Sequence, residues 1–174
     1  MEGNFKLSQN LILSLIFFAS IVFGGNNASA LDSPSGQVIL NVSGKITVFN
    51  AGNSAEFDLA MLERMKKTGF STTTPWFDGV TTFEGVLLRD LMEILGANGS
   101  IVVAIAANDY RANIPVSDFE DFDVILAYKK NGKYMTLRDN GPLFIVYPFD
   151  ESPELNRQKY FGRSVWQLGQ ILVN

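Results

Sequence analysis

Three polar segments interrupt otherwise apolar stretches of the sequence, and their side chains could bind a small polar molecule. The segments are TTTPW (72–76), NDY (108–110) and RDNGP (138–142). Amide, carboxylate and guanidinium groups supply hydrogen-bond donors and acceptors, while tryptophan and tyrosine offer flat surfaces for stacking. Each segment begins or follows a predicted strand, where binding loops are commonly found. If the three segments meet at one edge of the fold, they form a single pocket.

Each segment also has a purely structural explanation. Trp76 could fill the core, and a run of threonines is ordinary in a strand. Asp109 could cap a local turn through its side chain, and Tyr110 could be half-buried packing. Arg138 and Asp139 are adjacent, so in a strand their side chains would point to opposite faces. The residue types alone therefore leave both explanations open.

The chain contains no cysteine and no histidine, which excludes several kinds of chemistry. Disulfides, the usual zinc sites and nucleophiles activated by histidine all need these residues. The net charge is −4 and no basic stripe is present, so nucleic acid is not an expected partner. Calcium stays open in principle, but the sequence has no D-x-D-x-D-G loop.

Residues 1–30 have the three-part layout of a secretory signal peptide. Lys6 is followed by an apolar run at 11–25 and by Ala28, Ser29 and Ala30, a small-residue cleavage pattern. The apolar run is shorter than the roughly 20 residues that a membrane-spanning helix needs. We therefore expect cleavage after Ala30 and export to the periplasm, with an uncleaved anchor as the alternative. Residues 31–174 fit one domain of ordinary size.

The elements that must position the polar segments mix short strands with short helices, which favours an α+β domain. Apolar alternation and turn signals predict strands or extended segments at 38–42, 45–49, 70–78, 100–107, 124–130, 133–137, 143–148 and 162–173. Helical spacing predicts helices at 57–67 and 86–95 and a short turn or helix at 116–122. Residues 79–85 are predicted to form a loop.

Five pieces of sequence, in this order, resemble the molybdopterin-binding domain of the sulfite oxidase family. They are G-V-x-L-x-x-L (85–91), A-N-D-Y-x-x-x-I-P (107–115), L-A (126–127), N-G (131–132) and G-P-L-x-I-V-x-P (141–148). The resemblance covers most of residues 38–173, and it is closest to small exported members that consist of this domain alone. It implies a single α+β domain that is mainly β and carries a pterin-type site.

Two departures from the family pattern concern the metal. Molybdenum-bearing members carry a cysteine ligand just ahead of a W-x-G-V-x-L region, whereas residues 70–76 here read FSTTTPW. Threonine does not readily ionise to replace a soft thiolate. Members of the family also often have a histidine ahead of the G-x-P-L segment, where Arg138 and Asp139 stand here. We therefore expect a pterin pocket without molybdenum.

The T-P-W, N-D-Y and R-D-x-G-P-L segments also resemble small periplasmic pterin-binding regulators of this fold, which lack the metal-ligating cysteine. This resemblance implies a pterin or molybdopterin-like ligand. It implies as partner the periplasmic region of an inner-membrane protein that makes or degrades cyclic di-GMP. The expected function is regulation of that partner without redox catalysis.

A pterin is a flat bicyclic ring whose donor edge suits a carboxylate and whose carbonyl suits a cation. Asp109 or Asp139 could accept hydrogen bonds from the donor edge, and Arg138 or a backbone N–H group could serve the carbonyl. Trp76 or Tyr110 could stack on the ring face. The predicted pterin-binding residues are Thr74, Trp76, Asn108, Asp109, Tyr110, Arg138 and Asp139.

Two other functions stay open at this point. An oxidoreductase could hold molybdenum through the pterin dithiolene alone, or with an oxygen ligand such as Ser71 or Thr74. A structural relic could keep the fold as a protein-interaction domain without any ligand. Metal analysis separates the oxidoreductase from the pterin sensor, and an empty pocket lined by packed aromatic side chains would favour the relic.

Overall fold

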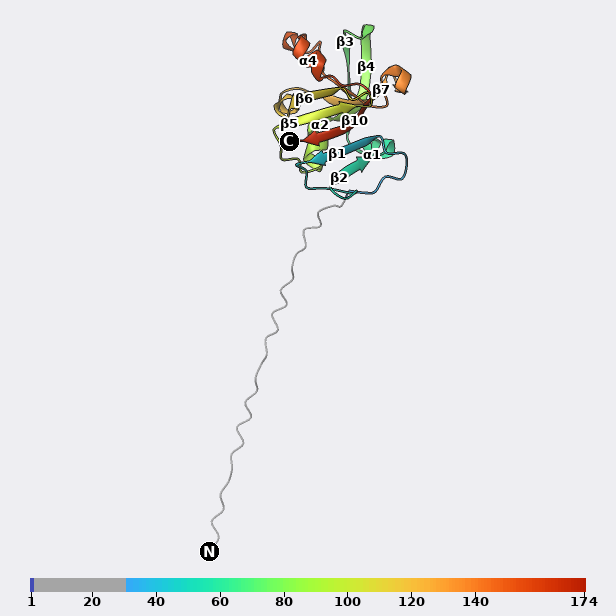
Figure 1. The fold of residues 1–174 in the computed structure, drawn as a ribbon. Coiled ribbons are helices and arrows are strands. Elements are labelled where there is room, and N and C mark those ends of the chain that lie inside the picture. Colours follow the sequence, from blue (N-terminus) through green and yellow to red (C-terminus); the bar gives the residue numbers. More distant parts are fainter. Residues whose placement is uncertain (2–30) are drawn as a thin grey trace.

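The computed structural model describes residue 1 and residues 31–174, and this part of the chain forms two β-sheets and four short α-helices (Figure 1). The predicted signal peptide lies outside the described residues, apart from Met1. Within the described part of the chain, no helix is both long and apolar enough to cross a membrane. The mainly β, α+β character that the family resemblance implied is confirmed.

The first sheet has the strand order β2-β1-β10-β5-β6. Its strands are β1 (Leu40–Gly44), β2 (Ser54–Phe57), β5 (Ile101–Ala106), β6 (Arg111–Pro115) and β10 (Leu168–Val173). All pairings are antiparallel except that of β1 with β10, which is parallel. The central strand β10 therefore joins the β1–β2 hairpin to the β5–β6 hairpin, whose connecting loop is the NDY segment.

The second sheet has the order β3-β4-β7-β8, and β9 pairs with β7. Its strands are β3 (Lys67–Thr74), β4 (Phe77–Leu87), β7 (Ile125–Lys130), β8 (Lys133–Tyr134) and β9 (Phe144–Val146). The far end of the β3–β4 hairpin projects from the body of the molecule (Figure 1), because β7 pairs with β4 only from Phe83 to Leu87. Trp76 lies in the turn of this hairpin.

The helices are short and connect the strands. They are α1 (Leu59–Arg64), α2 (Leu88–Ile94), α3 (Ser117–Asp121) and α4 (Gln158–Arg163), with the 3₁₀ turns η1 (Leu137–Asp139) and η2 (Pro153–Leu155). Asp58 caps α1 by accepting a hydrogen bond of 2.8 Å from the Met61 N–H group. The same carboxylate accepts a bond of 2.7 Å from the Gly36 N–H group, so it also holds the segment before β1.

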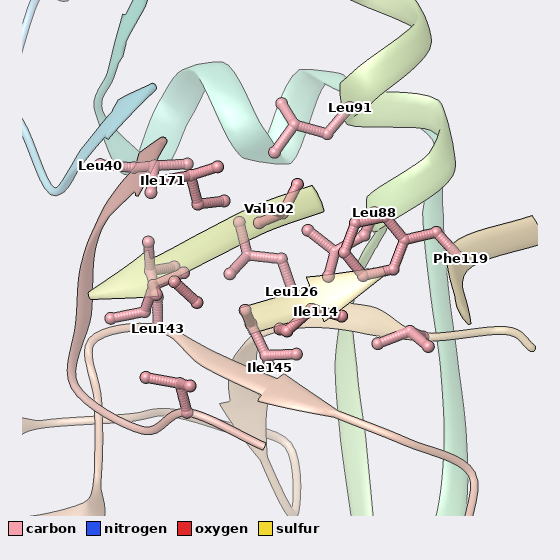
Figure 2. Close-up of a cluster of buried hydrophobic side chains, with 14 of the residues drawn as sticks. Leu40, Leu88, Leu91, Val102, Ile114, Phe119, Leu126, Leu143, Ile145 and Ile171 are labelled. Carbon is pink, nitrogen blue, oxygen red and sulfur yellow. The ribbon is translucent and has the colours of Figure 1, made fainter. Parts of the chain in front are cut away.

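The main core contains side chains from both sheets, α2 and α3 (Figure 2). Its almost fully buried members include Leu40, Leu88, Leu91, Val102, Ile114, Phe119, Leu126, Leu143, Ile145 and Ile171. A second, smaller cluster contains Phe83, Leu87, Ile125, Ala127, Met135, Phe144 and Val146. Strand β7 contributes to both clusters and is therefore buried on both faces. Trp76 and Trp166 pack against the second cluster.

The strand predicted at 45–49 is absent. This segment is irregular, and the N–H groups of Thr47 and Val48 donate to the Leu95 carbonyl at 2.9 and 3.1 Å. The alternating sequence thus places the segment against the end of α2 rather than beside β1. The antiparallel partner of β1 is β2 instead, which was not predicted as a strand.

The loop predicted at 79–85 is part of β4. Gly79 has a φ of 70° and lies at a bulge where the β3–β4 register shifts. Gly85 allows β7 to approach closely, because a Cβ atom there would lie 2.0 Å from the Leu126 carbonyl oxygen. Both glycines therefore allow residues 79–85 to form part of β4.

Other boundaries also differ from the prediction. The helix predicted at 86–95 begins only at Leu88, because Leu87 completes β4. The strand predicted at 162–173 begins only at Leu168, because α4 extends to Arg163. Strand β6 was missed because its five residues follow the NDY turn without a recognisable boundary.

Candidate ligand-binding pocket

A pocket of about 260 Å³ lies where the β3–β4 turn, the β5–β6 loop and α4 meet. Figure 1 shows α4 beside β6, at the same end of the fold as the β3–β4 hairpin. The lining residues are Trp76, Ala106, Asn108, Tyr110, Gln158, Phe161, Gly162, Ser164 and Trp166. Four of these nine residues are aromatic, and amide and hydroxyl groups are the polar members of the wall.

Trp76 is both a core residue and a wall of the pocket. Its ring meets those of Phe144 and Trp166 edge to face, with 5.6 Å between the centroids in each pair. Two further edge-to-face contacts join it to Phe149 at 6.0 Å and Phe161 at 6.1 Å. Such packing fixes the ring orientation and adds to the gain from burial. The structural and the binding explanations of Trp76 are thus compatible.

The β5–β6 loop presents Asn108 and Tyr110 to the pocket. The Asn108 side-chain oxygen accepts a bond of 3.1 Å from the Tyr110 N–H group, which forms a local turn. Asp109 stands between them with a φ of 65°, a conformation that suits glycine, asparagine and aspartate. The Tyr110 hydroxyl donates to the Gly162 carbonyl at 2.7 Å and so ties the loop to α4. Asp109 itself is exposed and does not line the pocket.

Helix α4 is held in place by a buried carboxylate on α3. Arg163 donates to both oxygens of Asp118 at 3.0 and 2.8 Å. The Tyr147 hydroxyl donates to the same carboxylate at 2.6 Å. Burial raises the pKa of Tyr147 well above its usual range, and the Asp118 charge adds to this effect. The phenol therefore stays protonated and remains a donor.

The third polar segment lies elsewhere. Arg138 and Asp139 belong to η1, and neither lines the aromatic pocket. Asp139 accepts a bond of 2.8 Å from the Thr136 hydroxyl and borders a separate hollow of about 310 Å³. This hydrogen bond, and the positive charge of Lys130, lower the pKa of Asp139. The structure thus brings two of the three predicted segments together.

Hydroxyl groups near the β3–β4 turn hold the turn and do not line the pocket. The Thr74 oxygen accepts a bond of 3.2 Å from the Phe77 N–H group, and the Ser71 hydroxyl lies 2.7 Å from that of Thr82. Asp150 accepts bonds of 2.6 and 2.7 Å from the hydroxyl and N–H groups of Thr73, which lower its pKa. Ser71 and Thr74 are therefore committed to local bonds, which does not favour them as metal ligands.

Sequence reasoning missed several wall residues, among them Phe161, Ser164 and Trp166. It also missed Gln167, which has a φ of 51° and connects the pocket to η1. Its carbonyl accepts a bond of 2.9 Å from the Ala107 N–H group, and its side chain donates to the Leu137 carbonyl at 2.9 Å. The tryptophan–glutamine pair after α4 was the available signal, but it was read as the interior of a strand.

No group of three or more potential metal-ligating side chains lies close together within the described residues. The family's molybdenum ligand is a thiolate, and this chain contains no cysteine. The aromatic wall suits the flat ring of a pterin. The side chains of the pocket thus fit the organic part of the cofactor and not its metal.

Comparison with known proteins agrees with the fold. A sequence model of the oxidoreductase molybdopterin binding domain matches residues 47–150, more than half of the 174 residues, and the chain belongs to this family. Among solved structures, it is similar to the sulfane dehydrogenase SoxCD from Paracoccus pantotrophus, with a TM-score of 0.59 and 18% identity. That match covers 77% of this chain and 37% of the SoxCD chain. No curated protein sequence matches the chain.

Proposed function

We propose that the chain is a periplasmic pterin-binding protein that regulates a membrane-bound signalling enzyme without catalysing a redox reaction. The observation that carries this proposal is the aromatic pocket formed by Trp76, Phe161 and Trp166 in a domain of the molybdopterin-binding family whose sequence has no thiol. The membrane partner, a cyclic di-GMP-metabolising enzyme, follows from the sequence resemblance to periplasmic regulators.

The pocket suits a compact bicyclic ring. Its volume of about 260 Å³ lies just below the range of pockets that hold drug-sized ligands. Aromatic rings provide surfaces for stacking, and the polar groups of Asn108, Gln158 and Ser164 can exchange hydrogen bonds with the edge of a pterin. Bonds of this kind fix the orientation of a ligand that apolar contact alone would leave free to rotate.

The same wall does not suit the complete molybdenum cofactor. Molybdopterin carries a phosphate, which proteins usually hold with arginine, lysine or a row of N–H groups. No lysine or arginine is among the residues that line the pocket. A pterin without phosphate and metal therefore matches the donor and acceptor set better than the complete cofactor does.

The test is to purify the protein from a periplasmic extract of cells that make both pterins and molybdenum cofactor. A denatured sample is oxidised and its pterin fluorescence recorded, and a native sample is analysed for molybdenum by mass spectrometry. Pterin at about one per chain without molybdenum supports the proposal. Molybdenum near one per chain overturns it in favour of an oxidoreductase with an unusual ligand set, and absence of both favours the relic.

A further inference from the structure

We propose that η1 and the β7–β8 hairpin form a docking surface for an acidic, partly apolar segment of a partner polypeptide. The surface, here called the basic hairpin surface, consists of Lys130, Lys133, Tyr134, Leu137 and Arg138. This inference rests on the proposed function, because it names the part of the molecule that a regulated partner would contact.

The charges on this surface are unusual for an acidic protein. Lys130, Lys133 and Arg138 take part in no salt bridge within the described residues. Lys130 and Lys133 line a hollow of about 310 Å³ in which Asp139 is the one carboxylate of the lining, and Arg138 precedes Asp139 in the chain. Three cations against one anion leave a local excess of positive charge on a chain whose net charge is −4. Such a reversal of sign attracts an acidic partner and repels a basic one.

At least one of the cations is held in position. The Lys130 ammonium lies 4.0 Å from the centroid of the Phe77 ring, a cation–π contact that links β7 to β4. The neighbouring Lys129 ammonium lies over the Tyr134 ring at 4.4 Å and 3.9 Å from a Glu63 oxygen. The Glu63 carboxylate also accepts a hydrogen bond from the Tyr134 hydroxyl, so it borders the surface, and Lys129 is the cation that offsets its charge.

Exposed apolar side chains lie among these charges. Tyr134 and Leu137 are 50% and 62% exposed, so apolar surface is available here to a partner. Tyrosine is enriched at protein–protein interfaces, and apolar groups framed by cations fit an acidic amphipathic segment. An anionic membrane is a poorer occupant, because three cations are few for a chain with a net negative charge.

Gln167 connects this surface to the pocket. Its side chain donates to the Leu137 carbonyl of η1, and its N–H group donates to the Asn140 carbonyl at 3.0 Å. Its own carbonyl accepts from Ala107, next to the pocket residue Asn108, and Trp166 precedes it in the chain. A ligand that shifts Trp166 or the β5–β6 loop therefore acts on η1 through Gln167. The pocket and the basic hairpin surface are thus connected by this residue.

The experiment uses the purified protein and a short fluorescent peptide in which glutamates alternate with leucine and tyrosine. The control peptide carries lysine in place of glutamate. Binding is followed by fluorescence anisotropy at low and at physiological salt. The first variant is the double substitution Lys130→Glu/Lys133→Glu. The single variant Lys133→Glu is compared with Lys45→Glu as its matched control, because Lys45 is an exposed lysine beside the other sheet.

We expect the acidic peptide to bind at least about tenfold more tightly than the basic one, and the double variant to lose this preference. Lys133→Glu should weaken binding more than Lys45→Glu. Equal affinity for both peptides, or equal effects of the two single variants, overturns the inference. Binding to phosphatidylglycerol vesicles in place of the acidic peptide also overturns it and identifies a membrane surface.

The link to the pocket is tested on the same samples. Added pterin should change the affinity for the acidic peptide by about threefold or more, and Gln167→Gly should remove this effect while pterin still binds. Glycine is chosen because it accepts the left-handed backbone of this position. Protein that binds pterin but shows no preference for the acidic peptide overturns the inference and leaves the proposed function intact. If the purified protein contains no pterin, that result overturns the proposed function itself.

Discussion

At the scale of single residues, the pocket uses side chains that the fold also needs. Trp76 packs against four aromatic rings and lines the pocket, and Tyr110 joins the β5–β6 loop to α4. Mutation of either residue therefore mixes a loss of stability with a loss of binding. Asn108 is a cleaner probe, because it is exposed and makes a single local hydrogen bond.

Asn108→Ala should weaken pterin binding about tenfold, which corresponds to the loss of one well-placed hydrogen bond. The matched control is the next residue, since Asp109 is exposed and is not among the residues that line the pocket. Asp109→Gly keeps the left-handed backbone and should leave the affinity unchanged. Titration of tryptophan fluorescence with pterin measures both variants, and an equal loss in the two would remove Asn108 from the site.

Asp150 should make stability depend on pH. Its folded-state pKa lies below the unfolded value of about 3.9, because the carboxylate accepts two bonds from Thr73. The contribution is thus present above about pH 4 and is lost as the pH falls through the folded-state pKa. Asp150→Asn should lower the free energy of unfolding by about 1 kcal/mol at pH 7. Urea unfolding at several pH values should show this difference disappearing in acid.

At the scale of elements, α4 is the part of the pocket that depends most on distant residues. Its six residues are too few to form a stable helix alone, so tertiary contacts must hold it. Arg163 provides the main one by pairing with the buried carboxylate of Asp118. The orientation of Phe161 and Gly162 in the pocket wall is thus set from α3.

Asp118→Ala should therefore lower the stability of the fold severely. It leaves Arg163 and the Tyr147 hydroxyl without their partner, and the expected cost is about 3–5 kcal/mol of unfolding free energy. Tyr147→Phe removes one bond and keeps the ion pair, so about 1 kcal/mol is expected. Chemical denaturation compares the two, and similar costs would show that the ion pair does not anchor α4.

The elements differ in how far they could be predicted from the sequence. Strand β5 was predicted almost to the residue, because an unbroken apolar run has few alternatives. Residues 79–85 were predicted to form a loop, but they belong to β4, which contains Gly79 and Gly85. Their actual roles, a bulge and a close approach of β7, depend on a neighbouring strand that local sequence does not reveal.

The pocket could be predicted only in part for the same reason. Asn108 and Tyr110 were identified because polar residues directly follow a buried strand. Arg138 and Asp139 were grouped with them on the assumption that all three segments meet, but η1 carries them to another hollow. Gln167 could not be found, because its role is made by hydrogen bonds to two loops that are distant in sequence.

At the scale of the whole molecule, the domain corresponds to about a third of the SoxCD chain with which it was compared. The fold is shared at 18% identity, and a shared fold does not by itself specify a shared function. Function in this chain must therefore be argued from its own pocket.

Binding to the folded state should stabilise the whole domain. A pterin at about a hundred times its dissociation constant adds about 2.7 kcal/mol, which raises the midpoint of thermal unfolding by roughly 5–10 °C. Scanning fluorimetry with and without pterin measures this shift, and Asn108→Ala should reduce it. Molybdate alone is expected to produce no shift, and a shift of equal size with molybdate would point to a metal site.

The position of β10 in the first sheet determines when that sheet can form during synthesis. Because β10 lies between β1 and β5, the two hairpins of that sheet stay separate until residues 168–173 are available. A ribosome-bound chain that ends before Leu168 therefore cannot complete this sheet. For the exported protein proposed above, the first sheet is therefore completed only after residues 168–173 have left the ribosome.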